Sequence, residues 1–270
     1  MPIDFHTHIF PEKIAEKTIS FLEKQGNTTA FHHGCLSDLK QSMCQSGIDY
    51  SVVLPVVTKP SQFETINSFA QSINLHDGIF SFGGIHPKND NLEQKLDYIK
   101  SLGLKGIKLH PDYQGCYIDD PDYLKTLRHC AKIGLLVTIH AGIDIGFRTD
   151  VHCPVHKTAK VLDILESEGL MQNPFIILAH LGGSEQWDAV EEQIVGHNVF
   201  LDLAFVLGLV PSDQLIRIIN NHSAERILFA TDSPWKSQKE DLNNFLSLPL
   251  TQEQKELILD KNAKRLLNIK

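Results

Sequence analysis

DYLKTLRHCAKIGLLVTIH (122–140) consists of an amphipathic segment, a glycine and a short apolar run that ends in a histidine. The pattern predicts a helix over 122–134 that stops at Gly134, followed directly by a strand over 134–140. The strand is an almost continuous run of Leu, Val and Ile, which is typical of a strand buried on both faces of a parallel sheet. A helix, a glycine and a strand in this order form the connection expected between parallel units.

The same unit recurs along the whole chain. The predicted strands are 2–8, 50–57, 78–86, 104–110, 134–140, 175–181, 198–205 and 226–232. The predicted helices are 13–26, 37–47, 65–78, 91–103, 122–134, 157–169, 184–196, 212–222 and 251–270. Eight strands that alternate with helices indicate an α/β protein, and eight is also the number that closes a (β/α)8 TIM barrel. We therefore expect residues 1–270 to form a single TIM-barrel domain. An open doubly wound sheet is the alternative, but no Gly-rich dinucleotide fingerprint follows the first strand.

The composition limits the partners and the compartment. The formal net charge is −8, and no stripe of Lys and Arg overrides it, which argues against nonspecific binding of nucleic acid. We expect no signal peptide and no membrane contact, because we find neither a basic segment followed by an apolar run nor a stretch of membrane-spanning length. The five dispersed cysteines favour a reducing cytoplasm over a disulfide framework. The expected partner is a small-molecule substrate, and a homo-oligomer remains open.

Histidines gather at the predicted strand ends. Six of the 14 histidines lie within the last three positions of a strand: His6, His8, His86, His110, His140 and His180. Chance would place about one of them there, and the carboxyl ends of barrel strands converge on the active site. Asp232 ends the eighth strand in the same way. The strand ends therefore predict one cluster of imidazoles and a carboxylate.

A metal centre is the chemistry that this cluster favours. His6 and His8 are two residues apart on a strand, so both side chains lie on one face. Imidazole nitrogen suits zinc, iron or nickel. The alternatives are that His140 and His180 are buried structural residues and that Asp232 caps the following helix.

The ordered motifs resemble a known family. DFHTHIFP (4–11), GIKLHP (106–111), HAG (140–142), AHLGG (179–183) and ATDSPW (230–235) are similar, in this order, to the amidohydrolase superfamily. More narrowly, they resemble its amidohydrolase-2 branch, which contains metal-dependent hydrolases and nonoxidative decarboxylases. The resemblance runs from residue 3 to about 235, and it implies a deformed (β/α)8 barrel of the metal-dependent hydrolase type.

The resemblance also implies a ligand set. It maps the metal ligands onto His6, His8, His140 and Asp232 for one divalent cation, with zinc as the first expectation. In single-metal relatives the sixth-strand histidine, here His180, acts as a base or a polariser. In two-metal relatives His140 and His180 hold the second ion, and a carboxylated lysine or a glutamate bridges the pair. Lys108 occupies the position of that bridge, but it is equally placed to bind a substrate carboxylate.

Further residues are predicted to touch the substrate. Lys108 and His110 share parity, so both are expected to face the site. His86 is expected to contact substrate or support the site, and Arg148, in the long loop after the fifth strand, is expected to grip an anionic substrate. A separate zinc site at His152, Cys153 and His156 is disfavoured because a further ligand pair is missing. Asp202 is either site-facing or structural.

The predicted reaction is hydrolysis of a small-molecule amide, lactone or related C–N or C–O bond by metal-activated water. Asp232 would orient the water and carry its proton, and His180 would polarise the carbonyl or stabilise the oxyanion. Nonoxidative decarboxylation of a small unsaturated or aromatic acid is the alternative reaction. An inactive barrel kept as a binding module is the alternative from another class.

Overall fold

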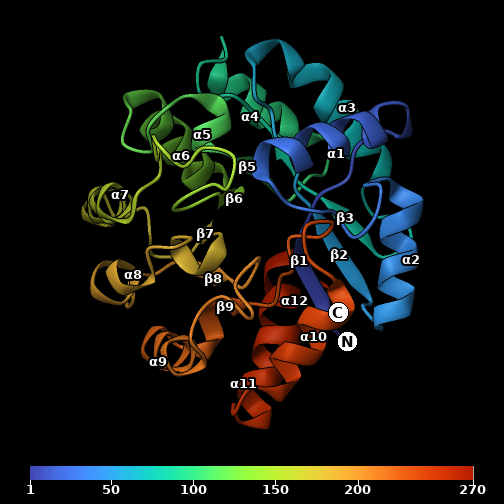
Figure 1. The fold of residues 1–270 in the computed structure, drawn as a ribbon. Helices are drawn as coiled ribbons and strands as arrows, with labels where there is room; N and C mark the ends of the chain where they lie inside the picture. Colours follow the sequence, from blue (N-terminus) through green and yellow to red (C-terminus); the bar gives the residue numbers. More distant parts are fainter. Residues whose placement is uncertain (270) are drawn as a thin grey trace.

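A ring of parallel strands forms the centre of the computed structural model, which describes residues 1–269 (Figure 1). The strands are β1 (Ile3–Thr7), β2 (Tyr50–Val53), β3 (Ile79–Ser81), β4 (Gly83–Gly84), β5 (Gly106–Leu109), β6 (Leu136–Ile139), β7 (Ile176–Leu178), β8 (Phe200–Asp202) and β9 (Ile227–Leu228). They pair in the order β1-β2-β3 and β4-β5-β6-β7-β8-β9. β3 and β4 are separated by Phe82 alone and correspond to one predicted strand, 78–86. The predicted (β/α)8 barrel is confirmed.

Backbone hydrogen bonds close the ring between its first and last strands. The Phe5 N–H donates to the Phe229 carbonyl over 2.9 Å, and the Asp232 N–H donates to the His6 carbonyl over 2.9 Å. The His8 N–H donates to the Ser233 carbonyl over 2.6 Å. This seam therefore joins residues that are more than 220 positions apart in the sequence, and it sets His6 beside Asp232.

Helices surround the ring, as Figure 1 shows. The α-helices are α1 (Glu12–Gly26), α2 (Leu36–Ser46), α3 (Phe63–Ile73), α4 (Leu92–Ser101), α5 (Pro111–Gln114), α6 (Pro121–Ile133), α7 (Val155–Ser167), α8 (Trp187–Gln193), α9 (Ser212–His222), α10 (Gln238–Ser247), α11 (Gln252–Glu256) and α12 (Asn262–Leu267). Short 3-10 turns are η1 (Pro60–Gln62), η2 (His180–Gly182) and η3 (Ala224–Arg226), and η4 (Leu257–Lys261) is a π-helical segment between α11 and α12. No helix among the described residues is both long and apolar enough to cross a bilayer.

Two predicted helices are shorter in the structure, and helices α5 and α10 have no predicted counterpart. The predicted helix over 65–78 ends at Ile73, because the Asn74 side chain accepts a hydrogen bond from the Ser81 N–H and stabilises a turn there. The predicted helix over 184–196 shortens to α8. Helix α10 was not predicted, although its start carries a local signal: the Ser237 hydroxyl accepts from the Glu240 N–H, an ordinary N-cap.

His222, the last residue of α9, is buried away from the carboxyl ends of the strands and anchors that helix to the ring. Its Nε2–H donates to the Val199 carbonyl over 2.9 Å, and its Nδ1 accepts from the Gly196 N–H over 3.3 Å. Burial, which disfavours the charged ring, lowers the pKa of His222 to about 4.

This pKa predicts a pH-dependent stability. Between pH 4 and 6.5 the unfolded chain binds more protons at this site, so the group contributes stability above pH 6.5 that is lost as the pH falls toward 4. The loss amounts to about 3 kcal/mol for a shift of this size. The free energy of unfolding of wild type and of His222→Gln should be measured by urea titration at pH 7 and pH 4.5. The gap between them should narrow by at least about 2 kcal/mol at the lower pH, and a constant gap would refute the neutral buried imidazole.

Candidate metal centre

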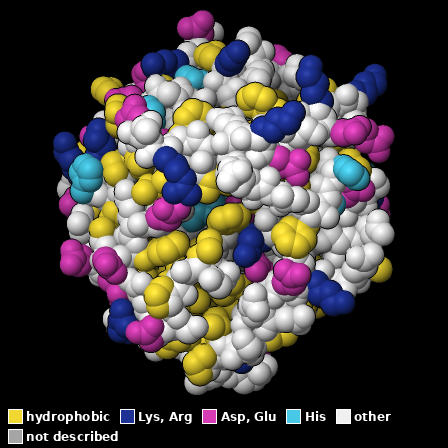
Figure 2. Space-filling view, viewed as in Figure 1, with side chains coloured by type: hydrophobic (Ala, Val, Ile, Leu, Met, Phe, Trp, Pro, Cys, Tyr) yellow, Lys and Arg dark blue, Asp and Glu magenta, His cyan; other side chains and the backbone are white. Residues whose placement is uncertain are grey.

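A cavity of about 600 Å³ opens at the carboxyl ends of the strands. Figure 2 shows histidine surface at the bottom of a central hollow, with apolar side chains beside and below it and a few charged side chains at its edge. The predicted site residues that line it are His6, His8, Lys108, His110, His140, His180 and Asp232. The structure thus brings all five residues of the predicted metal site, together with Lys108 and His110, to one place.

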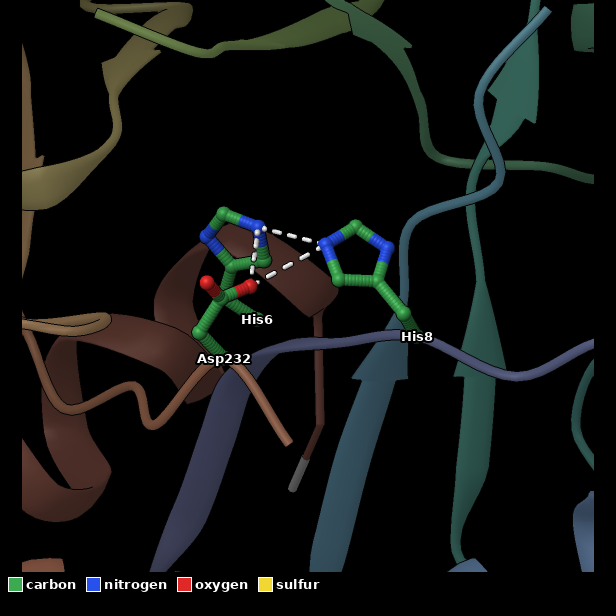
Figure 3. Close-up of side chains that lie close together, drawn as sticks. All are labelled: His6, His8 and Asp232. Carbon is green, nitrogen blue, oxygen red and sulfur yellow. Dashed lines mark hydrogen bonds and ion pairs between the residues drawn. The ribbon is translucent and has the colours of Figure 1, made fainter. Parts of the chain in front are cut away.

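The tightest group in the cavity comprises His6, His8 and Asp232 (Figure 3). The Nε2 atoms of His6 and His8 lie 3.1 Å apart. Asp232 Oδ1 lies 3.4 Å from His6 Nε2 and 3.1 Å from His8 Nε2. The three donor atoms therefore face one another across a space the size of a single atom.

The other nitrogen of each ring is already engaged. His6 Nδ1 lies 2.8 Å from Asp202 Oδ2, and His8 Nδ1 lies 2.9 Å from the Leu54 carbonyl oxygen. Both partners are acceptors, so each Nδ1 carries the proton and each Nε2 keeps its lone pair. Burial holds the pKa of His6 well below its usual range, which keeps this ring neutral.

This donor set fits a divalent cation. Lone pairs on two imidazoles and a carboxylate oxygen repel one another unless a proton or a cation lies between them. The separations of 3.1–3.4 Å match the edges of a tetrahedron around an ion with bonds of about 2.0–2.1 Å, which are about 3.3–3.4 Å long. Two imidazoles and a carboxylate are also ligands that zinc and other first-row metals accept.

Asp202 holds the site together from beneath. It is fully buried, and while Oδ2 accepts from His6, Oδ1 accepts from the His180 N–H over 2.9 Å and the Ala204 N–H over 3.1 Å. Burial raises the pKa of Asp202, and the nearby His180 and Lys108 oppose that rise. The sequence left open whether Asp202 faces the site or is structural. In the structure it supports the site from below, because its carboxylate orients the His6 ring and holds the backbone of His180.

A second group lies across the cavity. His180 Nδ1–H donates to the Ala204 carbonyl over 2.8 Å, so its Nε2 accepts from His140 Nδ1 at 2.9 Å. His140 stacks on His110 with ring centroids 4.1 Å apart. Asp144 Oδ2 lies 3.4 Å from His110 Nε2 and 3.8 Å from His140 Nε2. His140 Nε2 is buried and has no hydrogen-bond partner, which leaves its lone pair available.

The backbone at two site residues adopts the left-handed conformation that ordinary residues avoid. His180 has φ 57°, and Asp232 has φ 71°. Such residues persist only where their surroundings hold them, and they cluster at functional sites. Asp232 does not cap the following helix, because α10 begins at Gln238 and has Ser237 as its N-cap. Its carboxylate is therefore free to face His6 and His8.

Lys108 lies beside the centre on β5. Its side chain is buried, and Nζ lies 3.1 Å from His6 Nε2. Burial lowers the pKa of Lys108 to about 8, and the carboxylates of Asp202 and Asp232 limit the fall. The amine is thus close enough to the centre either to bridge two ions, if it were carboxylated, or to meet an anionic group of a substrate.

Two predicted substrate contacts lie elsewhere. His86 is not part of the cavity lining, because its Nε2–H donates to the Gln114 carbonyl and its Nδ1 accepts from the Lys88 N–H. Arg148 is also outside the lining; it is largely exposed and pairs with Glu185 over 3.2 Å. His152 bonds to Asp112, and Cys153 bonds to Thr158, so neither turns toward a shared site. The structure gives neither His86 nor Arg148 a direct path to a substrate in this cavity.

Sequence reasoning missed the role of several lining residues. Asp144 lies in the long loop after β6, and an isolated bridge between Gly142 and Ser184 directs that loop over the cavity. Tyr113 packs edge-on against His110 with ring centroids 4.6 Å apart. Phe205 and Trp235 complete the wall. The sequence carried no periodic signal for these loop positions.

Comparison with known proteins identifies the family. The chain belongs to the amidohydrolase family, whose model matches residues 3–269. This membership makes the protein an enzyme of the amidohydrolase type and confirms the resemblance seen in the sequence. No curated protein sequence matches the chain.

Solved structures with the same fold include both reaction types. A 2,6-dihydroxybenzoate decarboxylase in complex with 2,6-dihydroxybenzoate is 16% identical, with 99% of each chain covered and a TM-score of 0.71. A dihydroxybenzoic acid decarboxylase from Polaromonas sp. JS666, with bound manganese and the inhibitor 2-nitroresorcinol, is 16% identical over 99% of this chain and 97% of that one, with a TM-score of 0.70. A candidate 2-pyrone-4,6-dicarboxylic acid hydrolase from Pseudomonas putida is 16% identical over 99% and 97%, with a TM-score of 0.64. At this identity the likeness establishes the fold.

Proposed function

We propose that the enzyme hydrolyses a C–N or C–O bond of a small molecule, such as an amide or a lactone, with one divalent cation held by His6, His8 and Asp232. The observation that supports this most is the set of three facing donor atoms, whose two imidazoles are locked with their lone pairs inward. We propose zinc as the cation, because a small tetrahedral set of nitrogen and oxygen donors suits it. His140, which the structure groups with His110 and Asp144, is proposed as a further ligand through its unpartnered Nε2, and the set of three donor atoms supports the proposed centre without it.

The residues around the centre have different proposed roles in hydrolysis. When bound, the cation would acidify a water molecule and polarise the scissile carbonyl. Asp232 accepts the proton of the attacking water and delivers it to the leaving group. His180 donates its Nδ1–H to the Ala204 carbonyl and so presents the lone pair of Nε2, which can take up a proton; the resulting imidazolium can then stabilise the negative charge that develops on the carbonyl oxygen. Asp202 keeps His6 in the tautomer that presents Nε2.

Lys108 is proposed to act unmodified. Its Nζ lies at the edge of the centre, where an ammonium can receive a carboxylate of the substrate. Carboxylation would convert it to a bridge between two ions, and His140 with His180 would then hold the second. Native mass spectrometry at neutral pH distinguishes these states, since a carboxylated lysine adds the mass of carbon dioxide and loses it in acid.

Nonoxidative decarboxylation is a second candidate. The observation in its favour is that Lys108, the one Lys or Arg that is buried among residues 1–269, adjoins the donor set, as a carboxylate substrate would require. Decarboxylases are also among the structures that share this fold. Hydrolysis adds a solvent oxygen to the product, whereas decarboxylation replaces the carboxylate by a proton and releases carbon dioxide.

An isotope experiment separates the two reactions. The zinc-loaded protein is incubated in H2(18)O with panels of lactones, amides and hydroxylated aromatic acids, and products are read by mass spectrometry. Hydrolysis predicts one solvent oxygen in the product, whereas decarboxylation predicts carbon dioxide and a product without the label. Asp232→Asn, purified in the same way, controls for contaminating enzymes. Unlabelled product with released carbon dioxide would overturn the hydrolase assignment.

A further inference from the structure

The cavity is larger than a reacting bond requires. At about 30 Å³ per water molecule, its volume of about 600 Å³ corresponds to roughly 20 water molecules. The proposed cation and the attacking water would occupy only the end of the cavity where the imidazoles, Lys108 and Asp232 lie, which we call the inner end. The remaining volume extends outward between α1, α3 and the loop that carries Ile145.

The outer part of the cavity has an apolar lining. Helix α1 contributes Ile14 and Phe21, α3 contributes Ile66 and Phe69, and the loop after β6 contributes Ile145. Polar groups there are neutral hydroxyls and amides, such as those of Thr18 and Gln62. The titratable side chains are thus confined to one end of the cavity, and an apolar wall forms the other.

Among the described residues no Lys or Arg lines this outer part, although the Lys236 ammonium lies 5.7 Å from the ring centroid of Phe205, a lining residue. Among the described residues that line the cavity, Lys108 is the only Lys or Arg, and it lies at the inner end, 3.1 Å from His6 Nε2. Arg148, which the sequence suggested as an anion-binding residue, pairs with Glu185 outside the lining. A carboxylate carried outward would lose hydration without gaining a partner, which is unfavourable.

The wall also includes apolar side chains that face solvent. Phe21 is 63% exposed and Ile14 is 49% exposed, and both line the cavity mouth. Contiguous exposed apolar surface rimmed by polar groups commonly marks a ligand groove. Here that surface is continuous with the cavity that contains the donor set, which points to the substrate as its occupant.

We infer that the substrate carries an uncharged apolar group, an alkyl chain or an aryl ring, that extends from the reacting bond outward between α1 and α3. This inference rests on the proposed hydrolase centre, which supplies the inner end. The inferred apolar group excludes substrates that carry a second carboxylate far from the reacting bond. A buried methylene contributes about a fourfold gain in affinity, so the apolar group supplies much of the binding.

Three hydroxamic acids test the inference by binding alone. Acetohydroxamic acid supplies a head that chelates the cation, octanohydroxamic acid adds an alkyl tail, and suberic monohydroxamic acid carries the same length of tail with a terminal carboxylate. Dissociation constants are measured by isothermal titration calorimetry on the zinc-loaded protein. We expect the octanoyl compound to bind at least about 30-fold more tightly than the acetyl compound and at least about 10-fold more tightly than the carboxylate-ended one.

Phe21→Lys provides the matched variant. Because Phe21 is largely exposed, a lysine there leaves the core intact, and it supplies a cation at the cavity mouth. The variant should reverse the preference toward the carboxylate-ended compound. Phe31→Lys is the control, since Phe31 is 56% exposed and lies outside the lining, and it should leave all three affinities unchanged.

The possible outcomes separate this inference from the proposed function. Equal affinity of all three compounds would overturn the apolar extension and leave the cation centre standing. Absence of binding by all three would overturn both. If Phe21→Lys changes only the molecular mass in light scattering and not the affinities, the apolar surface is a contact between copies of the chain, and the inference is wrong.

Discussion

Asp232→Asn is expected to lower turnover at least about 1000-fold while the barrel stays folded. The substitution replaces a carboxylate that faces His6 Nε2 at 3.4 Å and His8 Nε2 at 3.1 Å by an amide that is a poor ligand and a poor base. General base catalysis alone is worth about 100- to 10,000-fold. Turnover of the substrate identified in the isotope experiment should be measured together with zinc content per chain.

The matched control for this prediction is Asp213→Asn. Asp213 is an exposed acid on α9 that pairs with Arg217, remote from the cavity, so it should retain activity within about twofold. Circular dichroism should show the same helix content for both variants. Activity of Asp232→Asn within tenfold of wild type would show that another group carries the proton.

Asp4→Ala is expected to lower the free energy of unfolding by about 3 kcal/mol. Asp4 is fully buried at the seam, where it accepts from the Thr231 N–H over 3.0 Å, the Thr231 hydroxyl over 2.6 Å and the Gln238 amide over 2.8 Å. Alanine would leave the two Thr231 donors without this acceptor and the Gln238 amide with Ser51 Oγ alone, although relief from burying the carboxyl offsets part of the cost. That burial raises the pKa of Asp4 to about 6.

The Asp4 prediction is checked by urea unfolding at pH 7. Asp4→Asn retains one acceptor oxygen and the volume, so it should lose less stability than Asp4→Ala. Because His6 and Asp232 lie on either side of this seam, Asp4→Ala should also weaken zinc binding, measured by competition with a chelator. A loss below about 1 kcal/mol would mean that the backbone hydrogen bonds close the ring without help from this carboxyl.

Most of the barrel and the inward-facing ligands could be predicted from local patterns. Strand periodicity places His6 and His8 on one face, and the strand ends place Asp232, His140 and His180 at one rim. A barrel with its strands in sequence order places the first strand beside the last, but the pattern does not say which side chains touch at the rim. His6 and Asp232 come from neighbouring strands and meet directly, whereas His140 comes from β6 and lies with His180, His110 and Asp144 instead.

The residues that were misplaced or missed depend on tertiary contacts. His86 has the strand-end position of a site residue, but nearby backbone groups of Lys88 and Gln114 occupy both of its ring nitrogens. Asp144 enters the cavity because a long loop folds over it, and such a loop has no periodicity to read. Arg148 belongs to the same loop and points to Glu185, which removes the anion-binding role expected of it.

An anomalous-difference map at the zinc edge tests most directly whether His6, His8 and Asp232 hold a divalent cation. Crystals of the zinc-loaded protein should show a strong peak in contact with His6 Nε2, His8 Nε2 and Asp232 Oδ1. Metal analysis of the same preparation should give about one ion per chain. No peak between these three atoms, or a peak confined to His110, His140 and Asp144, would contradict the account.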